Sequence, residues 1–419
     1  MLNLSPEQQT IVRDIQAIAS RSGYRLFAVG GLVRDWLLGQ QDAPADLDLV
    51  VVGETNCAIL VARELRQKYP VRYVEHLKFQ TAELHWRNFT LDLATARQEY
   101  YPHAGANPVV TASTLEQDLW RRDFTINALA VEIQPEGQIG AVIDLCQGVR
   151  DLTAGVVRPI HANSFWEDPR RIFRGVRFAV RLGFSLPLAV QAEISQVCHS
   201  GIHDGIGGSR LQAELRYILR EGSPRQINTI CQQLQDLGAW RCVDPQFQPS
   251  SKLSAELRRL RKWCGWFGAI APHALDLAVL LYPAQSPVLA KLNLPPSLIE
   301  QVHCAKLLHQ DLAKFPENPS PSQICDRLEP EQLNTLILAG AVQPHPLLWR
   351  YLTHWRHIPP LLSGKELKGL GYPVGKEFGQ LLQAIRHATL DGLIQDKQQA
   401  CALADDYWRT KLGRIMPNQ

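Results

Sequence analysis

Two aspartates one residue apart, Asp46 and Asp48, lie in the stretch "APADLDLVVVG". On a β-strand, residues two apart point to the same face, so the two carboxylates project side by side while Leu47 and Leu49 turn toward the core. Carboxylates this close repel each other, and two Mg²⁺ ions about 4 Å apart can relieve the repulsion, activate an attacking hydroxyl and neutralise a departing pyrophosphate. The pattern predicts that Asp46 and Asp48 are metal ligands and catalytic acids. A solvent-facing turn is the alternative, because "QQDAPADLD" is also typical of loops.

A double glycine, Gly30-Gly31, precedes these acids and separates an apolar stretch from a short helical one. Glycines between a strand and a helix let backbone amides approach a phosphate at the positive end of the helix dipole. Arg34, one turn into the expected helix, can reach the same anion. We therefore expect Gly30, Gly31 and Arg34 to bind the phosphates of a nucleotide, although such a turn can also serve packing alone.

A third acid, Asp92, lies in the strand-like stretch "FTLDLAT" and faces away from Leu91 and Leu93. It can join the first two acids as a catalytic carboxylate. It can equally be an edge residue or pair with Arg97, and both interpretations stay open at this point.

Two neighbouring arginines, Arg121 and Arg122, lie in "DLWRRDFTINALAV", ahead of an acid and of a segment that we expect to be helical. Two guanidinium groups suit a triphosphate or a sugar, yet they can equally pair with Asp118 and Asp123. Asn127, about one turn later, can contact a ribose or cap a backbone group. The stretch predicts nucleotide binding by Arg121, Arg122 and Asn127.

The most informative stretch is "FWEDPRRIFRGVRFAVRLGF", in which Arg171, Arg174 and Arg177 recur every three residues on one side of a helix. Asp168 stands at the helix start, so it is either an N-cap or one half of a base-reading pair. Cytosine and adenine each present an exocyclic amine beside an unprotonated ring nitrogen, which Asp168 and Arg171 can read together. Uracil and guanine present the reverse pattern and would leave both groups unsatisfied, at a cost of roughly 1 to 3 kcal/mol each.

Composition limits the class of protein. The 419 residues are enough for two to four domains, and the net charge of +3 does not by itself indicate a nucleic-acid binder. Nine cysteines are widely spaced and form no CxxC pair, which argues against disulfides and a zinc site. Without a signal peptide or a long apolar run, we expect a soluble cytoplasmic protein that does not enter a membrane.

The elements that carry these residues fall into two regions. The first ~150 residues begin with a helix at Ser5-Pro6 and then alternate strands and helices, which predicts an α+β domain around a mixed sheet. From there to the end, helical periodicity punctuated by proline and glycine predicts an all-α remainder. Candidate breaks are "EGSPRQ" near 222, "FQPSSKLS" near 250 and "KFPENPSPSQ" near 318.

With these segments in place, the chain closely resembles the class II tRNA nucleotidyltransferase and bacterial poly(A) polymerase family of the DNA polymerase β superfamily. "GGLVRD" with "DLD", "RRDFTINA" and "EDPRR" match its motifs in order, over about the first 185 residues. "SRLQAEL" resembles a later motif, but Ser209 stands where the family usually has glutamate, so only Arg210 is carried over. "LSGKELKGLGYPVGKEFGQLLQAI" is similar to the tail of these enzymes, and its turn at Gly375-Lys376 can bind an RNA phosphate or simply join two helices.

The resemblance implies a catalytic head (1–150), a neck with the nucleotide template (151–222), a helical body (223–318) and a tRNA-binding tail (319–419). It implies transfer of C and A from CTP and ATP to the 3′ end of tRNA, with Mg²⁺ as the cofactor and the acceptor stem and T arm as the bound part of the tRNA. The catalytic acids are then Asp46, Asp48 and Asp92. The nucleotide-binding residues are Gly30, Gly31, Arg34, Arg121, Arg122, Asn127, Asp168, Arg171, Arg174 and Arg177.

Within the family, a complete CCA-adding enzyme competes with a CC-only or A-only enzyme that works with a second nucleotidyltransferase, and with a poly(A) polymerase. The loop region "QEYYPHAGANPVVTASTLEQ" is not shortened, which favours CCA addition mildly. An inactive tRNA-binding protein is the alternative from a different class, and the retained acids argue against it. His203-Asp204 lacks surrounding metal ligands, so we expect no HD phosphohydrolase activity.

Overall fold

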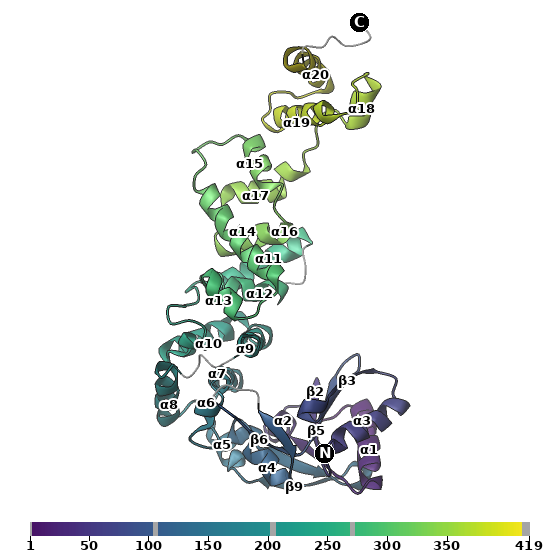
Figure 1. The fold of residues 1–419 in the computed structure, drawn as a ribbon, viewed down its shortest axis with the longest axis vertical. Helices are drawn as coiled ribbons and strands as arrows, with labels where there is room; N and C mark the ends of the chain where they lie inside the picture. The colour runs from purple at the N-terminus through teal and green to yellow at the C-terminus, as the bar shows by residue number, and fades with distance from the viewer. Residues whose placement is uncertain (1, 104–107, 202–206, 269–272, 413–419) are drawn as a thin grey trace. The chain divides into compact units, whose positions relative to one another are not determined.

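The computed structural model describes residues 2–103, 108–201, 207–268 and 273–412 (Figure 1). The chain divides into two compact units, Met1–Gln248 with Lys291–Asn293, and Pro249–Ala290 with Leu294–Gln419. This boundary falls in the stretch near 250 that the sequence marks as a candidate break, and the finer division into head, neck, body and tail stays a prediction. His203 and Asp204 lie outside the described residues.

A seven-stranded sheet forms the N-terminal part of the first unit, in the order β3-β4-β5-β2-β1-β8-β9. Strands β2 and β5 run parallel and the other neighbours run antiparallel, so the predicted mixed sheet is confirmed. A separate ribbon pairs β6 with β7. The strands are β1 (Arg25–Val29), β2 (Asp46–Val52), β3 (Arg72–His76), β4 (Thr81–His85), β5 (Thr90–Thr95), β6 (Arg97–Tyr100), β7 (Val109–Ala112), β8 (Leu129–Ile133) and β9 (Ile139–Asp144).

The first helix starts where the sequence predicts it. The Ser5 hydroxyl accepts a hydrogen bond from the Gln8 backbone N–H, and the Ser5 backbone N–H donates to the Gln8 side-chain oxygen. The helices of the first unit are α1 (Pro6–Arg21), α2 (Gly31–Leu37), α3 (Cys57–Lys68), α4 (Leu115–Trp120), α5 (Gly148–Ala154), α6 (Ser164–Glu167), α7 (Arg170–Leu182), α8 (Leu188–His199), α9 (Gly208–Glu221) and α10 (Pro224–Asp236).

The two faces of the sheet differ. Helix α3 packs on the face that carries Thr95, and α4 packs on the other face, where Leu115 and Leu119 join the buried Val50 and Ala96. Side chains alternate along a strand, so Asp48 and Asp46 point to the same face as Val50, the face that α4 covers. That face is therefore the one on which the acids of β2 lie.

The turn between β4 and β5 is held by its own aromatic side chains. The Trp86 and Phe89 rings stack with their centroids 4.9 Å apart, and the Trp86 amide donates to the Phe89 carbonyl at 2.9 Å. These contacts set the alignment with which β5 returns into the sheet beside β2.

The expected helix after Asp123 is wrong. Only a single 3₁₀ turn, Thr125–Asn127, forms there, and the chain continues as strand β8. Strand β8 lies between β1 and β9, and Leu129, Ala130 and Val131 are fully buried. A strand buried on both faces lacks polar alternation, so pairing with β1 and β9 overrides a pattern that alone favours a helix.

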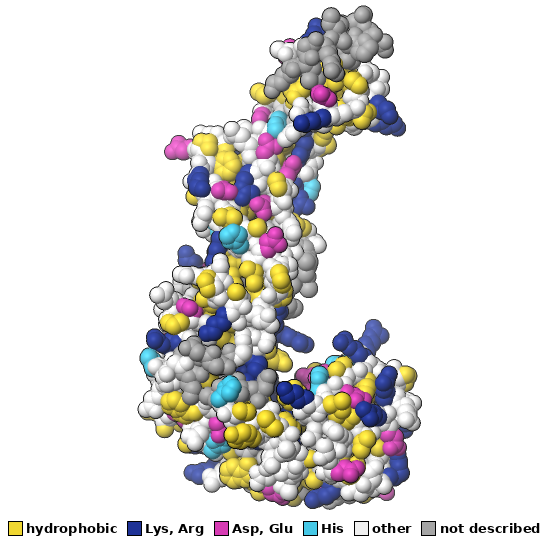
Figure 2. All heavy atoms as spheres, in the orientation of Figure 1, with side chains coloured by type: hydrophobic (Ala, Val, Ile, Leu, Met, Phe, Trp, Pro, Cys, Tyr) yellow, Lys and Arg dark blue, Asp and Glu magenta, His cyan; other side chains and the backbone are white. Residues whose placement is uncertain are grey.

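The described residues after β9 contain helices and no further strand, which confirms the all-α prediction. Within the described parts of the chain, every helix is too short or too polar to cross a lipid bilayer. Basic and acidic side chains are interspersed on the face that Figure 2 shows, in keeping with the small net charge. The helices are α11 (Leu253–Phe267), α12 (His273–Leu280), α13 (Ser286–Lys291), α14 (Pro296–Leu312), α15 (Pro321–Leu328), α16 (Leu333–Val342), α17 (Pro346–Thr353), α18 (Gly364–Gly369), α19 (Lys376–Leu390) and α20 (Lys397–Leu412).

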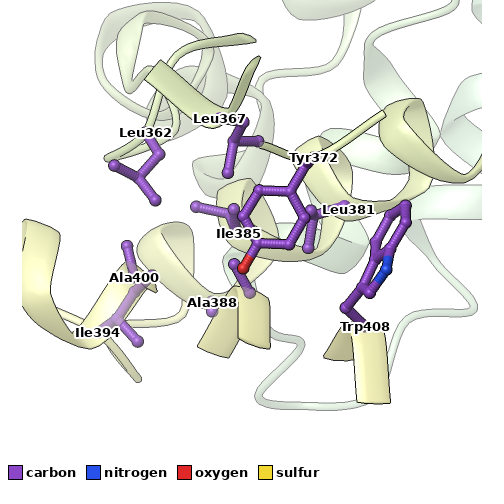
Figure 3. Close-up of a cluster of buried hydrophobic side chains, with 10 residues drawn as sticks. Leu362, Leu367, Tyr372, Leu381, Ile385, Ala388, Ile394, Ala400 and Trp408 are labelled. Atoms are coloured by element: carbon purple, nitrogen blue, oxygen red, sulfur yellow. The ribbon is translucent and has the colours of Figure 1, made fainter. Parts of the chain in front are cut away.

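The last three helices share a core of their own. Leu367, Leu381, Ile385 and Trp408 surround Tyr372, which lies between α18 and α19 (Figure 3). The Tyr372 hydroxyl leaves this apolar cluster and donates to an Asp405 carboxylate oxygen at 2.6 Å, so its polar group is satisfied at the edge of the core.

The second unit also contains an aromatic cluster around Trp263. The Trp263 ring lies 5.4 Å from Trp349 and 6.0 Å from Phe267, and its other neighbour is Gly340 of α16. A methyl group on Gly340 would come within 1.8 Å of the Trp263 ring. Helices α11 and α16 can therefore approach this closely only because residue 340 has no side chain.

We expect Gly340→Ala to lower the free energy of unfolding by about 1–3 kcal/mol, because the added methyl overfills the contact with Trp263. Gly265→Ala is the matched control, since Gly265 lies on α11 with no atom within 4 Å of an added methyl. The control should raise stability by about 0.5–1 kcal/mol through helix propensity. Scanning calorimetry of the two variants checks this, and effects of the same sign would contradict the packing explanation.

Candidate active site

One cavity of about 830 Å³ in the first unit collects the predicted site. Strands β2 and β5, the Gly30 turn, and helices α7 and α9 all contribute to its wall. It is lined by every residue to which the sequence assigns a catalytic or nucleotide-binding role, namely Gly30, Gly31, Arg34, Asp46, Asp48, Asp92, Arg121, Arg122, Asn127, Asp168, Arg171, Arg174 and Arg177.

Acidic residues of adjacent strands lie at one side of this cavity. Asp48 on β2 stands directly opposite Asp92 on the parallel strand β5, and Glu83 on β4 stands opposite Asp92 on its other side. Burial, together with the negative charges of Asp48, Glu83 and Asp46, raises the pKa of Asp92 to about 7. The alternative pairing with Arg97 is wrong, because Arg97 donates to Glu99 instead.

These carboxylates fit a divalent cation. The Asp92 Oδ1 atom is buried and has no hydrogen-bond partner among the described residues, and burial also raises the pKa of Asp48. Carboxylate oxygens are the ligands that Mg²⁺ prefers, and a cation would relieve both the desolvation and the repulsion. In the described parts of the chain, no group of three His, Cys, Asp or Glu side chains is positioned to hold a metal ion by itself.

The Gly30 turn lies beside the acids and depends on glycine. Gly30 adopts φ +65°, and a methyl group there would come within 3.0 Å of an Arg122 guanidinium nitrogen. Arg34 is buried, donates to Asp35 at 2.7 Å and donates to Asn127 at 2.6 Å, although Arg34 and Asn127 are 93 residues apart. Two motifs predicted separately are thus joined by a direct hydrogen bond.

Arg121 and Arg122 take the partner that the sequence offers as the alternative. Both donate to the fully buried Asp118, at 2.6 and 2.9 Å, and Arg121 also donates to Glu99 at 2.8 Å. Burial raises the pKa of Asp118, but the attraction of the two arginines outweighs it and lowers that pKa to about 2. Asp118 therefore fixes both arginines in place, and Glu99, which also lines the cavity, adds a second contact to Arg121.

Asp168 and Arg171 both reach the cavity but do not contact each other through their side chains in the structure. Arg170 donates to Asp168 through its backbone N–H, Nε and Nη2 atoms, and Arg210 donates at 3.1 Å. These four bonds occupy the acceptor positions of a carboxylate. Arg171 donates instead to the Ser164 hydroxyl at 2.6 Å and to the Arg121 carbonyl at 3.1 Å.

Arg174 and Arg177 are paired with acids that the sequence interpretation missed as site residues. Arg174 donates to Asp123 at 2.8 Å, and Arg177 pairs with Glu221. Buried Glu214 lies 3.7 Å from Arg174 and 3.9 Å from Arg177. Glu214 and Glu221 are seven residues apart on α9, two helical turns, and this spacing is the signal that could have placed them on one face.

Comparisons with known proteins agree with these motifs. A family model described as the poly A polymerase head domain matches residues 26–158. An A-adding tRNA nucleotidyltransferase of Geobacter sulfurreducens is 31% identical over 91% of this chain, which spans only 45% of that relative's length. A protein of the same description from Halalkalibacterium halodurans is 28% identical over 97% of this chain and 94% of its own.

The fold matches over the same extent. The solved structure of the Thermotoga maritima CCA-adding enzyme complexed with tRNA has a TM-score of 0.70 and 26% identity, over 96% of each chain. The mixed sheet, the helices that follow it and the single cavity that gathers all the motifs are thus accompanied by similarity along nearly the whole sequence. These matches support the family of class II tRNA nucleotidyltransferases and bacterial poly(A) polymerases.

Proposed function

We propose that the chain adds nucleotides from ATP or CTP to the 3′ end of tRNA. The observation that carries this proposal is the single cavity in which acids of adjacent strands, a glycine turn and a row of arginines face one another. In the reaction, the 3′-hydroxyl oxygen of the tRNA attacks the α-phosphorus, the bond to the β-phosphate oxygen breaks, and pyrophosphate leaves. An inactive tRNA-binding protein would have no use for buried carboxylates without partners.

We assign the acids Asp46, Asp48 and Asp92 to the part of the cavity where the α-phosphate reacts. Asp46 and Asp48 would hold Mg²⁺, which when bound supplies Lewis-acid activation of the hydroxyl and neutralises charge on the leaving pyrophosphate. Asp92 faces Asp48 from the next strand and adds a third carboxylate to the same side of the cavity. Arg122 lies against the Gly30 turn, where its guanidinium group can bind a phosphate of the nucleotide.

Asp168 and Arg171 are our proposed base readers. Since both are hydrogen-bonded to protein groups in the structure, reading a base requires each to exchange a partner, for example Arg210 on Asp168. The exchange favours cytosine and adenine, whose amine and ring nitrogen replace the lost bonds, over bases that present the reverse pattern.

We propose that the tRNA acceptor stem and T arm lie along the helical part of the chain, residues 151–419. Exposed basic side chains there include Arg258 and Lys262 on α11 and Lys376 at the start of α19. Phosphate contacts of this kind supply affinity that depends on salt and little on sequence.

Two versions of the function have specific support. A-addition is favoured by the relatives from Geobacter sulfurreducens and Halalkalibacterium halodurans. Both are described as A-adding tRNA nucleotidyltransferases, and their matches extend over almost all of this chain. Complete CCA addition is favoured by the name of the matched solved structure and by the full-length loop region between residues 98 and 117.

Incubation with tRNAs that end before C74, C75 and A76, each with CTP, ATP or both, separates these versions. Extension only of the tRNA lacking A76, and only by ATP, supports A-addition, whereas extension of all three supports CCA addition. Growth beyond A76 indicates a poly(A) polymerase, and binding without any extension contradicts the proposal.

Asp46→Ala and Asp48→Ala should each lower transfer at least a thousandfold at saturating Mg²⁺ while leaving tRNA affinity within about twofold, because removal of a metal ligand affects only the chemical step. Glu7→Ala, an exposed acid on α1, is the matched control. Single-turnover rates and filter binding give the two readouts, and near-normal rates in either cavity variant would remove the metal assignment.

Asp92→Asn should stabilise the metal-free protein at pH 8. The pKa of Asp92 is raised to about 7, so the folded state binds the proton more tightly than the unfolded state does, and the wild type loses stability as the pH rises from about 4 to 7. The asparagine variant lacks that loss. We expect its melting temperature in EDTA to exceed that of the wild type by several degrees at pH 8 and to match it at pH 4. Added Mg²⁺ should raise the melting temperature of the wild type more than that of the variant.

Asp168→Asn and Arg171→Ala should reduce the preference for CTP and ATP over UTP and GTP by roughly ten- to a hundredfold in relative kcat/KM. A helix-capping role alone predicts a lower melting temperature with unchanged selectivity. Measuring both quantities for each variant distinguishes the roles, and an intact preference for CTP over UTP in both would refute the protein template.

A further inference from the structure

The side chain of Phe178 lies in the cavity wall beneath three arginines. The guanidinium carbons of Arg34, Arg174 and Arg177 are 5.4, 5.5 and 4.8 Å from the centre of its ring. The ring is 7% exposed and is held from the other side by Phe124, edge to face at 6.0 Å. A single phenyl group thus contacts one arginine from the glycine turn and two from the arginine-rich helix.

The same arginines belong to a closed circuit of polar contacts, every member of which lines the cavity. Its order is Arg34, Asp35, Arg181, Glu221, Arg177, Glu214, Arg174, Asp123, Asn127 and back to Arg34. Positive and negative side chains are equal in number. The longest links are those of Glu214, at 3.7 and 3.9 Å, so this is the loosest part of the circuit.

Three guanidinium groups gathered at one ring repel one another, and the structure offsets that repulsion in two ways. The acids of the circuit accept hydrogen bonds from the arginine N–H groups. The face of Phe178 attracts the cations without occupying any N–H donor, since the attraction comes from the ring quadrupole. Arg177 Nε is buried and has no hydrogen-bond partner among the described residues, so the circuit leaves one guanidinium N–H of Arg177 unused.

We propose that Phe178 is a positioning residue of the nucleotide site, which holds Arg34, Arg174 and Arg177 against the cavity wall with donors available for a nucleoside triphosphate. The inference rests on the proposed function, because it takes ATP or CTP as the ligand. Arg34 follows the Gly30 turn and Arg174 follows the base-reading pair, so the ring couples the phosphate-binding part of the site to its base-reading part.

Phe178→Leu tests the proposal, because leucine preserves an apolar side chain and removes the ring quadrupole. We expect the dissociation constant for ATP, measured by calorimetry without tRNA, to rise about tenfold. In the transfer assay KM for ATP should rise by a similar factor, with kcat changed less than threefold. Phe178→Met, which fills more of the volume, should show the same loss.

Phe173→Leu is the matched control. Phe173 is likewise a buried phenylalanine of α7, but it packs against Trp240 and does not line the cavity. It should lower the melting temperature and leave the ATP dissociation constant unchanged. Unchanged ATP binding in the folded Phe178 variants, or an equal loss in Phe173→Leu, would overturn the proposal. If the wild type binds ATP and extends no tRNA, the proposed function fails while the role of Phe178 in ATP binding is still decided by the calorimetry.

Discussion

The repulsion between Asp48 and Asp92 is the constraint on which the rest of the first unit depends. The two carboxylates face each other across adjacent hydrogen-bonded strands. Burial raises the pKa of both, and neighbouring acids add to the shift at Asp92, whereas the positive charge of Arg122 opposes it at Asp48. Two like charges on neighbouring strands lower the free energy of unfolding. The backbone hydrogen bonds of the sheet and the apolar side chains buried on its opposite face offset this loss. A bound cation, as proposed above, would relieve this repulsion.

The arginines around the cavity show how a site can be prepared for an anion before the anion arrives. Each one is held by a carboxylate, an amide, a carbonyl or an aromatic ring, as with Asp118 for Arg122 and Phe178 for Arg177. Long side chains lose conformational entropy when they bind a ligand. Because these arginines are already held by protein partners in the folded state, that entropy is lost on folding and not on ligand binding. The same arrangement fills the acceptor positions of acids such as Asp168, so the base reading proposed above would require Asp168 to exchange a protein partner for the base.

Much of the site could be predicted from the sequence because its signals are local. The spacing of Asp46 and Asp48 on a strand, the glycine turn and the helix start at Pro169 are each set within a few residues. Partner choice could not be predicted, because Arg210 reaches Asp168 from 42 residues away and Arg34 meets Asn127 from 93. The wrong prediction of a helix at β8 has a similar origin. Strand β8 is buried on both faces, Ala130 included, only because it lies between β1 and β9, which are distant in the sequence or follow it.

The alignment of β5 with β2 also limits how this protein can change in length. Asp92 faces Asp48 because β5 enters the sheet in one register, set at the turn where Trp86 stacks on Phe89. A slip of one residue would bring Leu91 or Leu93 opposite Asp48 and turn Asp92 onto the face covered by α3. A slip of two residues would keep Asp92 on its face of the sheet but bring Thr90 or Ala94 opposite Asp48. An insertion or deletion that shifts β5 against β2 by any number of residues therefore separates the two carboxylates, whereas changes in the length of loops between helices leave this pairing intact.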